Sequence, residues 1–498
     1  MKYFLVSLIT AFFLVSCTKS QPKLEQTLVV ALESKPKTLD PRFATDANGQ
    51  RISSLLFQSL VRLGPDLEIV GELASHWEVG DKFVNFKIPR GLKFSDGSLI
   101  TQEDILFSIN EYRKPTNIFS NAYKNIKELK MNEKESYWEL TFLLNSNSAT
   151  LLVDLSPLKI MPKTKIESLG KDFYKDLVGS GPYSLKKQTN NQLHLVKNPH
   201  FSGKVNNEGI LFKVIKDDNT RYLRMIKGDI DLAPSVLSAS SIKKIEQEQK
   251  FYLEKSPGLA MNYILINLQN PALGDKNFRL ALAHALDRSQ IIKFKLEGLA
   301  LPATSILSPG NPFFDDSMTA PEFDLEKAKE YLAKSKSKPE KLIIKSSNTP
   351  SVVENAKVLA NQFSKLGIKT DIQSFEWGTF YGDIKNGNFQ LATMRWVGAT
   401  DPDIYRIAFH SKELPPGRNR GYYQNTQLDQ LLDQGRSVMN PEKRISLYKK
   451  VQKQILKDLP IIPLWYNTQT NVVNKRVSGF KASKNGDFSY FPLFSVSE

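Results

Sequence analysis

The chain has 498 residues, of which 41% are hydrophobic and 24% are charged. This balance excludes a disordered chain, a collagen-like repeat and a protein with many membrane spans, and the length predicts about three domains. The formal net charge is +16, but the basic residues are spread along the chain without an arginine-rich stripe. We interpret the charge as a soluble surface suited to an anionic envelope, and we expect no nucleic-acid partner.

The N-terminal segment has the pattern of a bacterial lipoprotein signal. Lys2 precedes an apolar stretch over residues 3–15, and Cys17, the single cysteine of the chain, follows it. The stretch is too short to span about 30 Å of hydrocarbon, and a lone cysteine forms no internal disulfide. We expect residues 1–16 to be a signal peptide, Cys17 to carry a lipid and residues 17–26 to be a tether. A secretory signal without a lipid is the alternative.

Strand and helix patterns then alternate along the chain, which predicts an α/β fold with parallel strands. Residues 27–32 form an apolar run of strand length. Val84, Phe86 and Ile88 alternate with polar residues, as in a half-buried strand. Thr101 with Asp104 three residues later predicts the start of a helix that carries apolar residues at 105, 106 and 109.

The second half of the chain contains three clear helix patterns. Apolar residues between 278 and 286 recur at helical spacing. Ser351 with Glu354 predicts a full capping box for a helix to about residue 365, Gly367 fits its C-terminus, and an alternating strand follows over 368–372. Asn440 and Pro441 predict the start of a late helix, after which residues 459–466 return the chain to a strand.

The chemical signatures of an enzyme are missing from the sequence. The five histidines show no metal-ligand spacing, so we expect no metal, and no serine stands in a GxSxG frame. The glycines of Gly179-Ser180-Gly181 resemble a phosphate loop, but Pro182 and the alternating residues after it favour a tight turn into a strand. We expect no catalysed reaction and no cofactor.

Several segments together resemble one family, the large extracytoplasmic solute-binding proteins of family 5, which are the oligopeptide- and dipeptide-binding proteins of ABC importers. The resemblance covers nearly the whole chain after the signal and rests on the order and spacing of its pieces. These are residues 38–41 (TLDP), 72–79 (ELASHWEV), 90–98 (RGLKFSDGS), 101–104 (TQED), 179–183 (GSGPY), 197–199 (KNP), 278–288 (FRLALAHALDR) and 387–403, from GNFQL through Trp396 to DPD.

The resemblance implies a two-lobed periplasmic-binding-protein type II fold, with an extra domain inserted in the first lobe. We expect lobe I to comprise residues 27–50, 180–265 and 467–498, the inserted domain residues 51–179, and lobe II residues 266–466. The resemblance further implies a monomer outside the cytoplasm. This monomer would close on a ligand, as hinged proteins do, and deliver it to the permease subunits of an ABC transporter.

The resemblance also indicates the candidate ligand-binding residues and one departure. Family members that bind peptides with free N-termini place an aspartate three residues after the tryptophan, where this chain has Ala399. Asp401 or Asp403 is the candidate replacement for the carboxylate that binds the ligand ammonium. Trp396 is a candidate apolar wall, and Arg395 a candidate partner of a ligand carboxylate. Glu33 and Ser34 are candidates because strand ends face the cleft in such folds.

Three functional alternatives remain open at this point. The first is a peptide-binding importer component, with Asp401 or Asp403 binding the amine. The second keeps the fold and the transport role but changes the ligand to an N-blocked peptide, an oligosaccharide, an opine-like compound or a metal chelate. A buried ammonium without a partner costs about 3–5 kcal/mol, and the residue at 399 motivates this alternative. The third is an enzyme or structural protein on the same scaffold.

Overall fold

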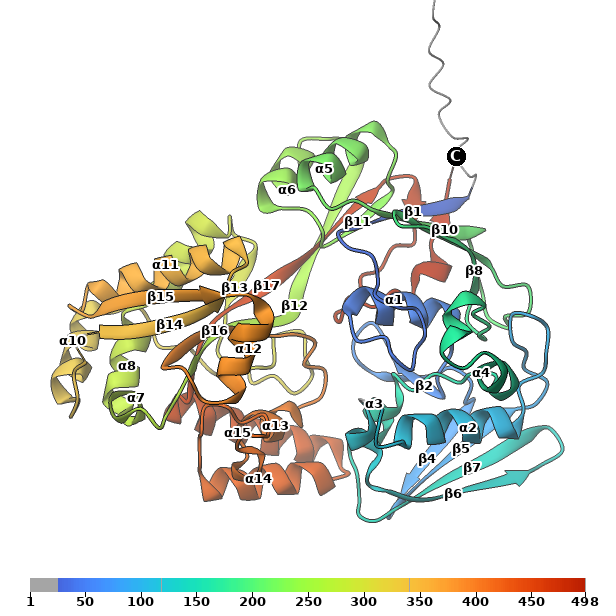
Figure 1. Ribbon diagram of the computed structural model, residues 1–498, viewed down its shortest axis with the longest axis horizontal. Helices are drawn as coiled ribbons and strands as arrows, with labels where there is room; N and C mark the ends of the chain where they lie inside the picture. Colours follow the sequence, from blue (N-terminus) through green and yellow to red (C-terminus); the bar gives the residue numbers. More distant parts are fainter. Residues whose placement is uncertain (1–25, 118, 340, 498) are drawn as a thin grey trace, which may run out of the picture.

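The computed structural model describes residues 26–117, 119–339 and 341–497. The predicted signal peptide and Cys17 therefore lie outside the described residues, as does nearly all of the tether. Figure 1 shows two lobes joined by two long strands, β12 (Phe251–Ile266) and β17 (Ile461–Asn474). Within the described residues these strands belong to one sheet of 11 strands, in the order β15-β14-β16-β12-β17-β11-β1-β10-β9-β8, with β13 also paired to β17. The sheet is therefore continuous from one lobe to the other.

The two long strands form the connection about which the lobes can move. β12 and β17 pair antiparallel over most of their length, and the register shifts between Pro257 and Met261. A register shift interrupts the regular ladder and bends the strand. The interruption lies near the middle of β12, between its contacts with the two lobes, so bending there changes the angle between lobes without breaking either core.

Lobe I is built on the half of the sheet that contains β1, and its β1 strand confirms the predicted strand at residues 27–32. β1 (Thr27–Leu32) is parallel to β10 and β11, while β9 is antiparallel to both β8 and β10. The other strands on this side of the sheet are β8 (Tyr183–Gln188), β9 (Gln192–Lys197), β10 (Gly209–Val214) and β11 (Leu232–Pro234). The helices α5 (Asp218–Lys227) and α6 (Ala239–Ile245) lie beside it.

A second, antiparallel sheet completes lobe I, in the order β4-β5-β7-β6. Its strands are β4 (His76–Gly80), β5 (Phe83–Pro89), β6 (Ile126–Glu133) and β7 (Tyr137–Leu144), with the small hairpin β2 (Val61–Leu63) and β3 (Ile69–Gly71) nearby. Four helices accompany it: α1 (Ala47–Leu56), α2 (Gln102–Arg113), α3 (Leu151–Leu155) and α4 (Lys163–Leu169). The buried residues of β5 are Val84, Phe86 and Ile88, as the alternation predicts.

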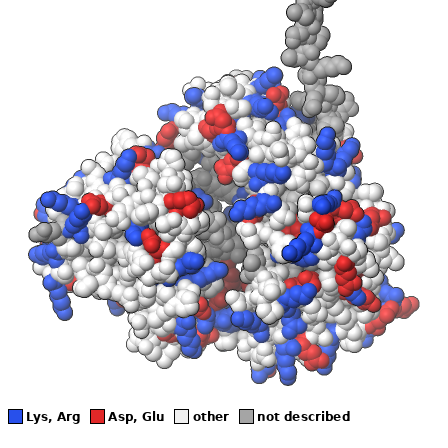
Figure 2. Space-filling model, viewed as in Figure 1, with Lys and Arg blue, Asp and Glu red and all other residues white. Residues whose placement is uncertain are grey.

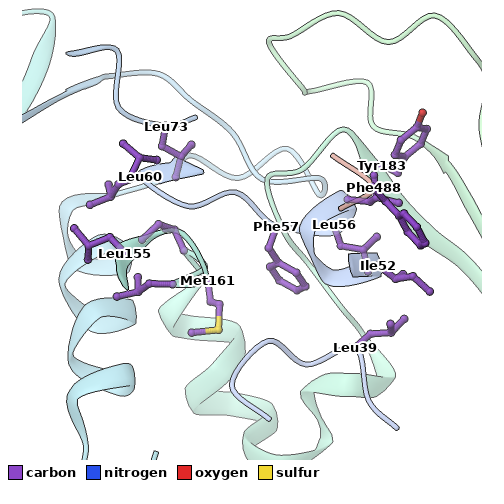
Figure 3. Packing of buried hydrophobic residues seen from close by; sticks show 14 of the residues in the cluster. Leu39, Ile52, Leu56, Phe57, Leu60, Leu73, Leu155, Met161, Tyr183 and Phe488 are labelled. Atoms are coloured by element: carbon purple, nitrogen blue, oxygen red, sulfur yellow. The ribbon is translucent and has the colours of Figure 1, made fainter. Parts of the chain in front are cut away.

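One apolar core joins the two sheets of lobe I. It contains Leu28 and Phe212 of the large sheet together with Phe86 and Phe142 of the small one. Figure 3 shows Ile52 and Leu56 of α1 near Tyr183 and Phe488, with Leu155 and Met161 on the other side of Phe57. The predicted boundary between residues 50 and 51 falls inside α1, so a helix, and not a linker, connects the two predicted parts. The division into domains stays a prediction.

The glycines at 179 and 181 allow the chain to pass close to the end of α1. The Gly181 amide donates a hydrogen bond to the Leu56 carbonyl over 2.9 Å. A Cβ at Gly179 would lie 2.1 Å from the Leu56 carbonyl oxygen, and one at Gly181 would lie 2.5 Å from that of Leu55. No side chain fits at these distances, so this motif serves a close backbone contact, and the predicted turn into strand β8 is confirmed.

Lobe II is built on the other half of the large sheet, where β14 is parallel to both β15 and β16. Its strands are β13 (Ala300–Pro302), β14 (Lys341–Ser347), β15 (Lys369–Phe375) and β16 (Leu391–Trp396). Its helices are α7 (Pro271–Gly274), α8 (Lys276–His284), α9 (Arg288–Gln290), α10 (Leu325–Lys334), α11 (Pro350–Ser364), α12 (Trp377–Lys385), α13 (Ile404–Phe409), α14 (Thr426–Ser437) and α15 (Pro441–Asp458). A two-stranded ribbon of β18 (Val477–Ser478) and β19 (Ser495–Val496) lies near the C-terminus.

Alternate residues of β12 divide lobe II into two cores. Ile264 and Ile266 belong to the core on one face, and Tyr263 and Leu265 to the core on the other. This alternation follows from the period of two in a strand. The first core packs α8 and α11, and the second packs residues of α12 to α15. The second face therefore carries the segment around Trp396 that the resemblance indicates as ligand-binding.

The helix predictions in lobe II hold except for one cap. α15 begins at Pro441 with Asn440 as its N-cap, as predicted. The capping box predicted for Ser351 and Glu354 is wrong, because α11 begins at Pro350 and its N-cap is Thr349, without a capping side-chain hydrogen bond. Proline favours the first position of a helix, and the observed cap therefore lies two residues upstream of the predicted one. None of the described helices is long and apolar enough to cross a membrane.

Candidate functional site

Strand β16 ends at the edge of lobe II with two of the predicted site residues, Arg395 and Trp396. Trp396 lies opposite Met261 of β12, and its ring stacks on that of Tyr263 with 6.2 Å between centroids and 10° between planes. The Arg395 side chain is exposed. The end of the sheet therefore presents an aromatic face and a cation side by side.

An aromatic pocket of about 210 Å³ opens beside these residues, and we define it by Tyr263, Trp377, Tyr381 and Trp396 with three arginines at its margin. Trp377 and Tyr381 stand one turn apart on α12 and stack at 5.3 Å, and Trp377 is 55% exposed. The arginines are Arg395, Arg418 and Arg420. Aromatic faces beside cations suit a planar or apolar group that carries a negative charge.

Arg420 is held at the pocket by its contact with α12. Its Nη2 donates a hydrogen bond to the Tyr381 hydroxyl over 2.6 Å, and its guanidinium lies 4.5 Å from the centre of the same ring. None of the three arginines forms an ion pair with a carboxylate among the described residues. The aromatic pocket therefore has positive charge that the neighbouring chain does not neutralise.

Ala399 does not face the cleft. Its side chain is 6% exposed and belongs to the apolar core behind β16, and its carbonyl accepts a hydrogen bond from Asn311 Nδ2 over 3.3 Å. The preceding Gly398 has a φ of +69°, a conformation that glycine adopts without strain. The turn thus directs residue 399 inward and leaves Val397, which is 64% exposed, on the surface.

Asp401 and Asp403 are already engaged by arginines of lobe II. Arg444 holds Asp401 with two hydrogen bonds of 2.8 and 2.9 Å, and Arg436 lies 3.4 Å from Asp403. Burial raises the pKa of the Asp403 carboxyl above its usual range, partly offset by Arg436. Neither aspartate lines the aromatic pocket or the cavity between the lobes. As placed, these carboxylates are parts of internal ion pairs.

Glu33 and Ser34 follow the end of β1, as the sequence predicts, and both are exposed. The Ser34 carbonyl accepts a hydrogen bond from Asn48 Nδ2 over 2.9 Å, which connects this loop to α1. Neither residue lines the aromatic pocket or the cavity between the lobes. Burial lowers the pKa of Arg51, and the charges of Asp487 and then Glu33 oppose that shift.

A cavity of about 330 Å³ lies between the lobes, and we call it the interlobe cavity. Lobe II contributes Val397, Gly398 and Thr400, and lobe I contributes residues of α1 and of the loops around 62–72, 156–159 and 485–489. Figure 2 shows a hollow between the two lobes, with charged side chains of both signs around it. Because its walls belong to both lobes, the size of the cavity depends on the angle between them.

Three cations and two carboxylates line the interlobe cavity: Arg51, Arg62, Lys159, Glu72 and Asp487. Glu72 Oε2 accepts the Ser59 amide at 2.6 Å and lies 3.9 Å from Lys159 Nζ, while Glu72 Oε1 lies 3.6 Å from Arg62 Nε. Burial raises the pKa of Glu72 above its usual range, and Lys159 opposes that shift. A single buried carboxylate thus serves two of the cations.

The described residues contain no group of three or more histidine, cysteine, aspartate and glutamate side chains placed to hold a metal ion. His284, within α8, contacts the Glu322 carbonyl at 2.7 Å and stacks on Tyr331 at 5.5 Å. His410 lies 3.2 Å from Asp433. Both histidines therefore have structural partners within lobe II.

Sequence reasoning missed the α12 aromatics and the cations of lobe I. Trp377 and Tyr381 are spaced i, i+4, whereas the buried residues of α12 are Phe380 and Ile384. Two aromatic residues at this spacing on the unburied side of an amphipathic helix are a signal that could have indicated a binding surface. Arg51 and Lys159 carried no comparable signal, because only the fold brings residues 108 positions apart into one wall.

A two-lobed molecule with a cavity walled by both lobes has the construction of a protein that binds a solute by closing around it. Comparison with known families identifies the class more closely. Residues 68–413 match the profile described as bacterial extracellular solute-binding proteins, family 5 Middle. The chain belongs to this family of solute-binding proteins, which confirms the resemblance drawn from the sequence.

Similar proteins match along nearly the whole chain. The probable D,D-dipeptide-binding periplasmic protein DdpA of Escherichia coli (strain K12) is 27% identical over 472 residues, which cover 91% of each chain. The oligopeptide-binding protein AppA of Bacillus subtilis (strain 168) is 26% identical over 523 residues, covering 96% of this chain and 95% of its own.

Solved structures share the two-lobed fold. The ABC transporter substrate binding protein CtaP of Listeria monocytogenes superposes with a TM-score of 0.84 at 23% identity, over 95% of this chain and 99% of its own. AppA of Bacillus subtilis in complex with a nonapeptide gives a TM-score of 0.77 at 24% identity, over 95% of this chain and 99% of its own. These likenesses confirm the predicted fold class.

Proposed function

We propose that this protein is the substrate-binding component of an ABC importer and that it captures peptides between its lobes. The observation that carries the proposal is the interlobe cavity, which lobe I and Val397, Gly398 and Thr400 of lobe II wall together. A ligand that touches both walls favours the closed arrangement by its differential affinity for it. The names of DdpA and AppA, which are peptide-binding proteins, support the choice of peptides.

The chemistry of the two hollows suits a short peptide. The aromatic pocket accommodates an apolar or aromatic side chain, with Trp377 and Trp396 as walls. The interlobe cavity offers charged partners of both signs for the polar main chain and the termini. Arg395 and Trp396 remain the proposed contacts from the sequence, and Trp377 and Tyr381 join them. Nothing in this arrangement calls for a reaction.

The function is tested by identifying the ligand that the protein retains. The mature chain without its lipid is purified from a bacterial periplasm and weighed by native mass spectrometry before and after denaturation. Released masses that fragment as peptides support the proposal. A single non-peptide mass, such as an opine-like compound, a saccharide or a metal chelate, would overturn the peptide assignment while keeping the transport role.

We further propose that a lipid on Cys17 anchors the protein to the outer side of a membrane, where it acts as a monomer beside its permease. The support is the signal pattern of residues 2–17 and the lack of another cysteine in the sequence. Mass spectrometry of the detergent-extracted mature protein is expected to find a diacylglyceryl group on an N-terminal Cys17. The Cys17→Ser variant is expected to appear in the soluble fraction. A mature protein that begins at another residue and carries no lipid would contradict the anchor.

A further inference from the structure

Lobe I contributes all three cations of the interlobe cavity. Arg51 lies in α1 and lines the cavity wall. Its guanidinium packs 5.6 Å from the centre of the Phe488 ring, and its Nη2 lies 2.7 Å from where a Cβ of Gly486 would stand. Aromatic and glycine surfaces therefore hold the side chain in place without neutralising its charge.

No carboxylate among the described residues forms an ion pair with Arg51, and no hydrogen bond from its guanidinium connects it to the rest of the described chain. Burial lowers the pKa of Arg51, and the more distant charges of Asp487 and Glu33 oppose this. A half-buried guanidinium with five donors is costly to leave without acceptors. Arg51 lines the interlobe cavity and also a smaller hollow beside Gly486, Asp487 and Phe488.

Lys159, on the same wall of the cavity, is a second cation without a close carboxylate. Its side chain is only 8% exposed, and its nearest carboxylate oxygen, on Glu72, lies 3.9 Å away, beyond hydrogen-bond distance. Glu72 is shared with Arg62 and with the Ser59 amide. The wall of lobe I therefore holds two cations whose donors lack close acceptors.

The charges of the cavity do not balance. Three cations face two carboxylates, and one of these carboxylates serves Arg62 and Lys159 together. Across the cavity, lobe II contributes uncharged residues, Val397, Gly398 and Thr400. When the lobes close and water leaves, an unbalanced positive charge becomes more costly unless the ligand brings a negative group.

We propose that Arg51 and Lys159 form a carboxylate-recognition site in the interlobe cavity, so that this protein selects ligands by their negative end. The inference rests on the proposed function and adds which chemical group of the ligand the cavity binds. A carboxylate matches the guanidinium fork, and the ammonium of Lys159 supplies a further donor. The carboxylate can be the C-terminus of a peptide or an acidic side chain, which share this chemistry.

The test uses three tetrapeptide libraries built from uncharged residues. The first has free C-terminal carboxylates, the second has C-terminal carboxamides, and the third has carboxamides with one internal glutamate. Binding to the mature full chain without its lipid is measured by thermal shift and by titration calorimetry. We expect the first or the third library to bind at least about 10-fold more tightly than the second, from a charge-assisted hydrogen bond of about 1.5–3 kcal/mol. The preferred library tells which carboxylate is recognised.

Arg51→Gln is expected to reduce binding of the preferred library about 10- to 100-fold and to leave the carboxamide library unchanged. Arg51→Lys keeps the charge and is expected to restore part of the affinity, which separates recognition from a loss of folding. Arg90→Gln is the matched control, because Arg90 is exposed and pairs with Glu133 on the surface.

Equal binding of all three libraries, unaffected by Arg51→Gln, would overturn the carboxylate site while leaving peptide capture intact. Binding of none of them would contradict the proposed function itself. Inorganic phosphate is the remaining probe. Competition by millimolar phosphate with the carboxylate library would mean that the site is a general anion site and would overturn its selectivity for carboxylates.

Discussion

At the scale of the residue, the surroundings of Asp401 and Asp403 decide what these carboxylates do more than their distance in sequence from Trp396. Asp401 stands two residues from the position that the family resemblance indicates, but Arg444 binds both of its oxygens at 2.8 and 2.9 Å. Both side chains are largely buried, with exposed fractions of 13% and 7%. Losing either partner of this buried pair would leave the other charge uncompensated, and binding a ligand ammonium would require Asp401 to give up Arg444.

Asp401→Ala is therefore expected to act on stability. Removing one partner of a buried pair leaves the Arg444 charge uncompensated and costs about 3–5 kcal/mol. Urea unfolding followed by circular dichroism measures this loss. Glu354→Ala is the control, because its ion pair with Lys357 is exposed and its loss should not move the midpoint. An unchanged midpoint for Asp401→Ala together with lost peptide binding would favour the ligand role predicted from the sequence.

Trp377 gives the second prediction at this scale. Its ring is 55% exposed and stacks on Tyr381 at the aromatic pocket, so it contributes little to the core. Trp377→Ala is expected to leave the unfolding midpoint nearly unchanged and to weaken ligand binding about 10-fold or more, as for loss of an aromatic wall. Calorimetric titration with the retained ligand measures the change. Trp138→Ala, which removes a buried ring of lobe I, should instead lower stability.

At the scale of the element, the ends of helices show where local sequence rules are sufficient. Helix α2 begins at Gln102 with a complete capping box, in which Thr101 accepts from the Asp104 amide and Asp104 accepts from the Thr101 amide. Helix α11 has the corresponding letters at 351 and 354, but it begins upstream of them. The motif forms its capping hydrogen bonds in α2 but not in α11, because Pro350 fixes the start of α11.

This contrast predicts different costs for two similar substitutions. Thr101→Ala removes a cap and is expected to cost about 1 kcal/mol of stability. Ser351→Ala removes no capping hydrogen bond and should be within about 0.5 kcal/mol of the parent protein. Both are measured by denaturant unfolding of the full chain. Equal costs for the two variants would contradict the observed start of α11.

At the scale of the whole molecule, the lobes also touch away from the connecting strands. The Ala149 amide of lobe I donates a hydrogen bond to the Arg436 carbonyl of α14 over 3.0 Å. Next to it, Asp154 of α3 accepts a hydrogen bond from Thr150 and lies near Asp401, Asp403 and Arg436 of lobe II. Figure 1 shows α3 beside the α14–α15 region. This contact brings carboxylates of both lobes together.

The contact is expected to depend on pH. Burial, with the charges of Asp401 and Asp403, raises the pKa of Asp154 to about 7, against the opposing hydrogen bond from Thr150 and the charge of Arg436. The touching arrangement therefore binds a proton more tightly than the separated one, so it gains stability as the pH falls from about 8 to about 5 and loses it as the pH rises.

Small-angle X-ray scattering of the ligand-free protein measures this change as a smaller radius of gyration at low pH. Asp154→Asn, which resembles the protonated form, should be compact over the whole range. Asp172→Asn is the control, since Asp172 is exposed in its pair with Lys175. A radius that varies equally with pH in the parent and in Asp154→Asn would contradict this role of Asp154.

Local pattern was sufficient for much of the fold. The strand at 27–32, the alternation at 84–88, the caps at Thr101 and Asn440 and the turn at 179–182 follow from periodicity, capping and glycine chemistry, which act between residues close in the sequence. The order and spacing of the motifs were sufficient to indicate the family. Arg395 and Trp396 lie at the end of strand β16, and their role as ligand contacts stays a prediction.

The site itself depended on contacts between distant parts of the chain. Ala399 turns inward because Gly398 and the core behind β16 direct it there, and Asp401 meets Arg444 only once α15 has packed. Arg51, Lys159 and Val397 share one cavity although they come from different elements and both lobes. The sequence alone determined the family of solute-binding proteins and, through that resemblance, the two-lobed fold, because the order and spacing of motifs can be recognised without the folded chain. The tertiary structure alone decided which charges are neutralised and which line the interlobe cavity, because charge pairing depends on distances that only packing sets.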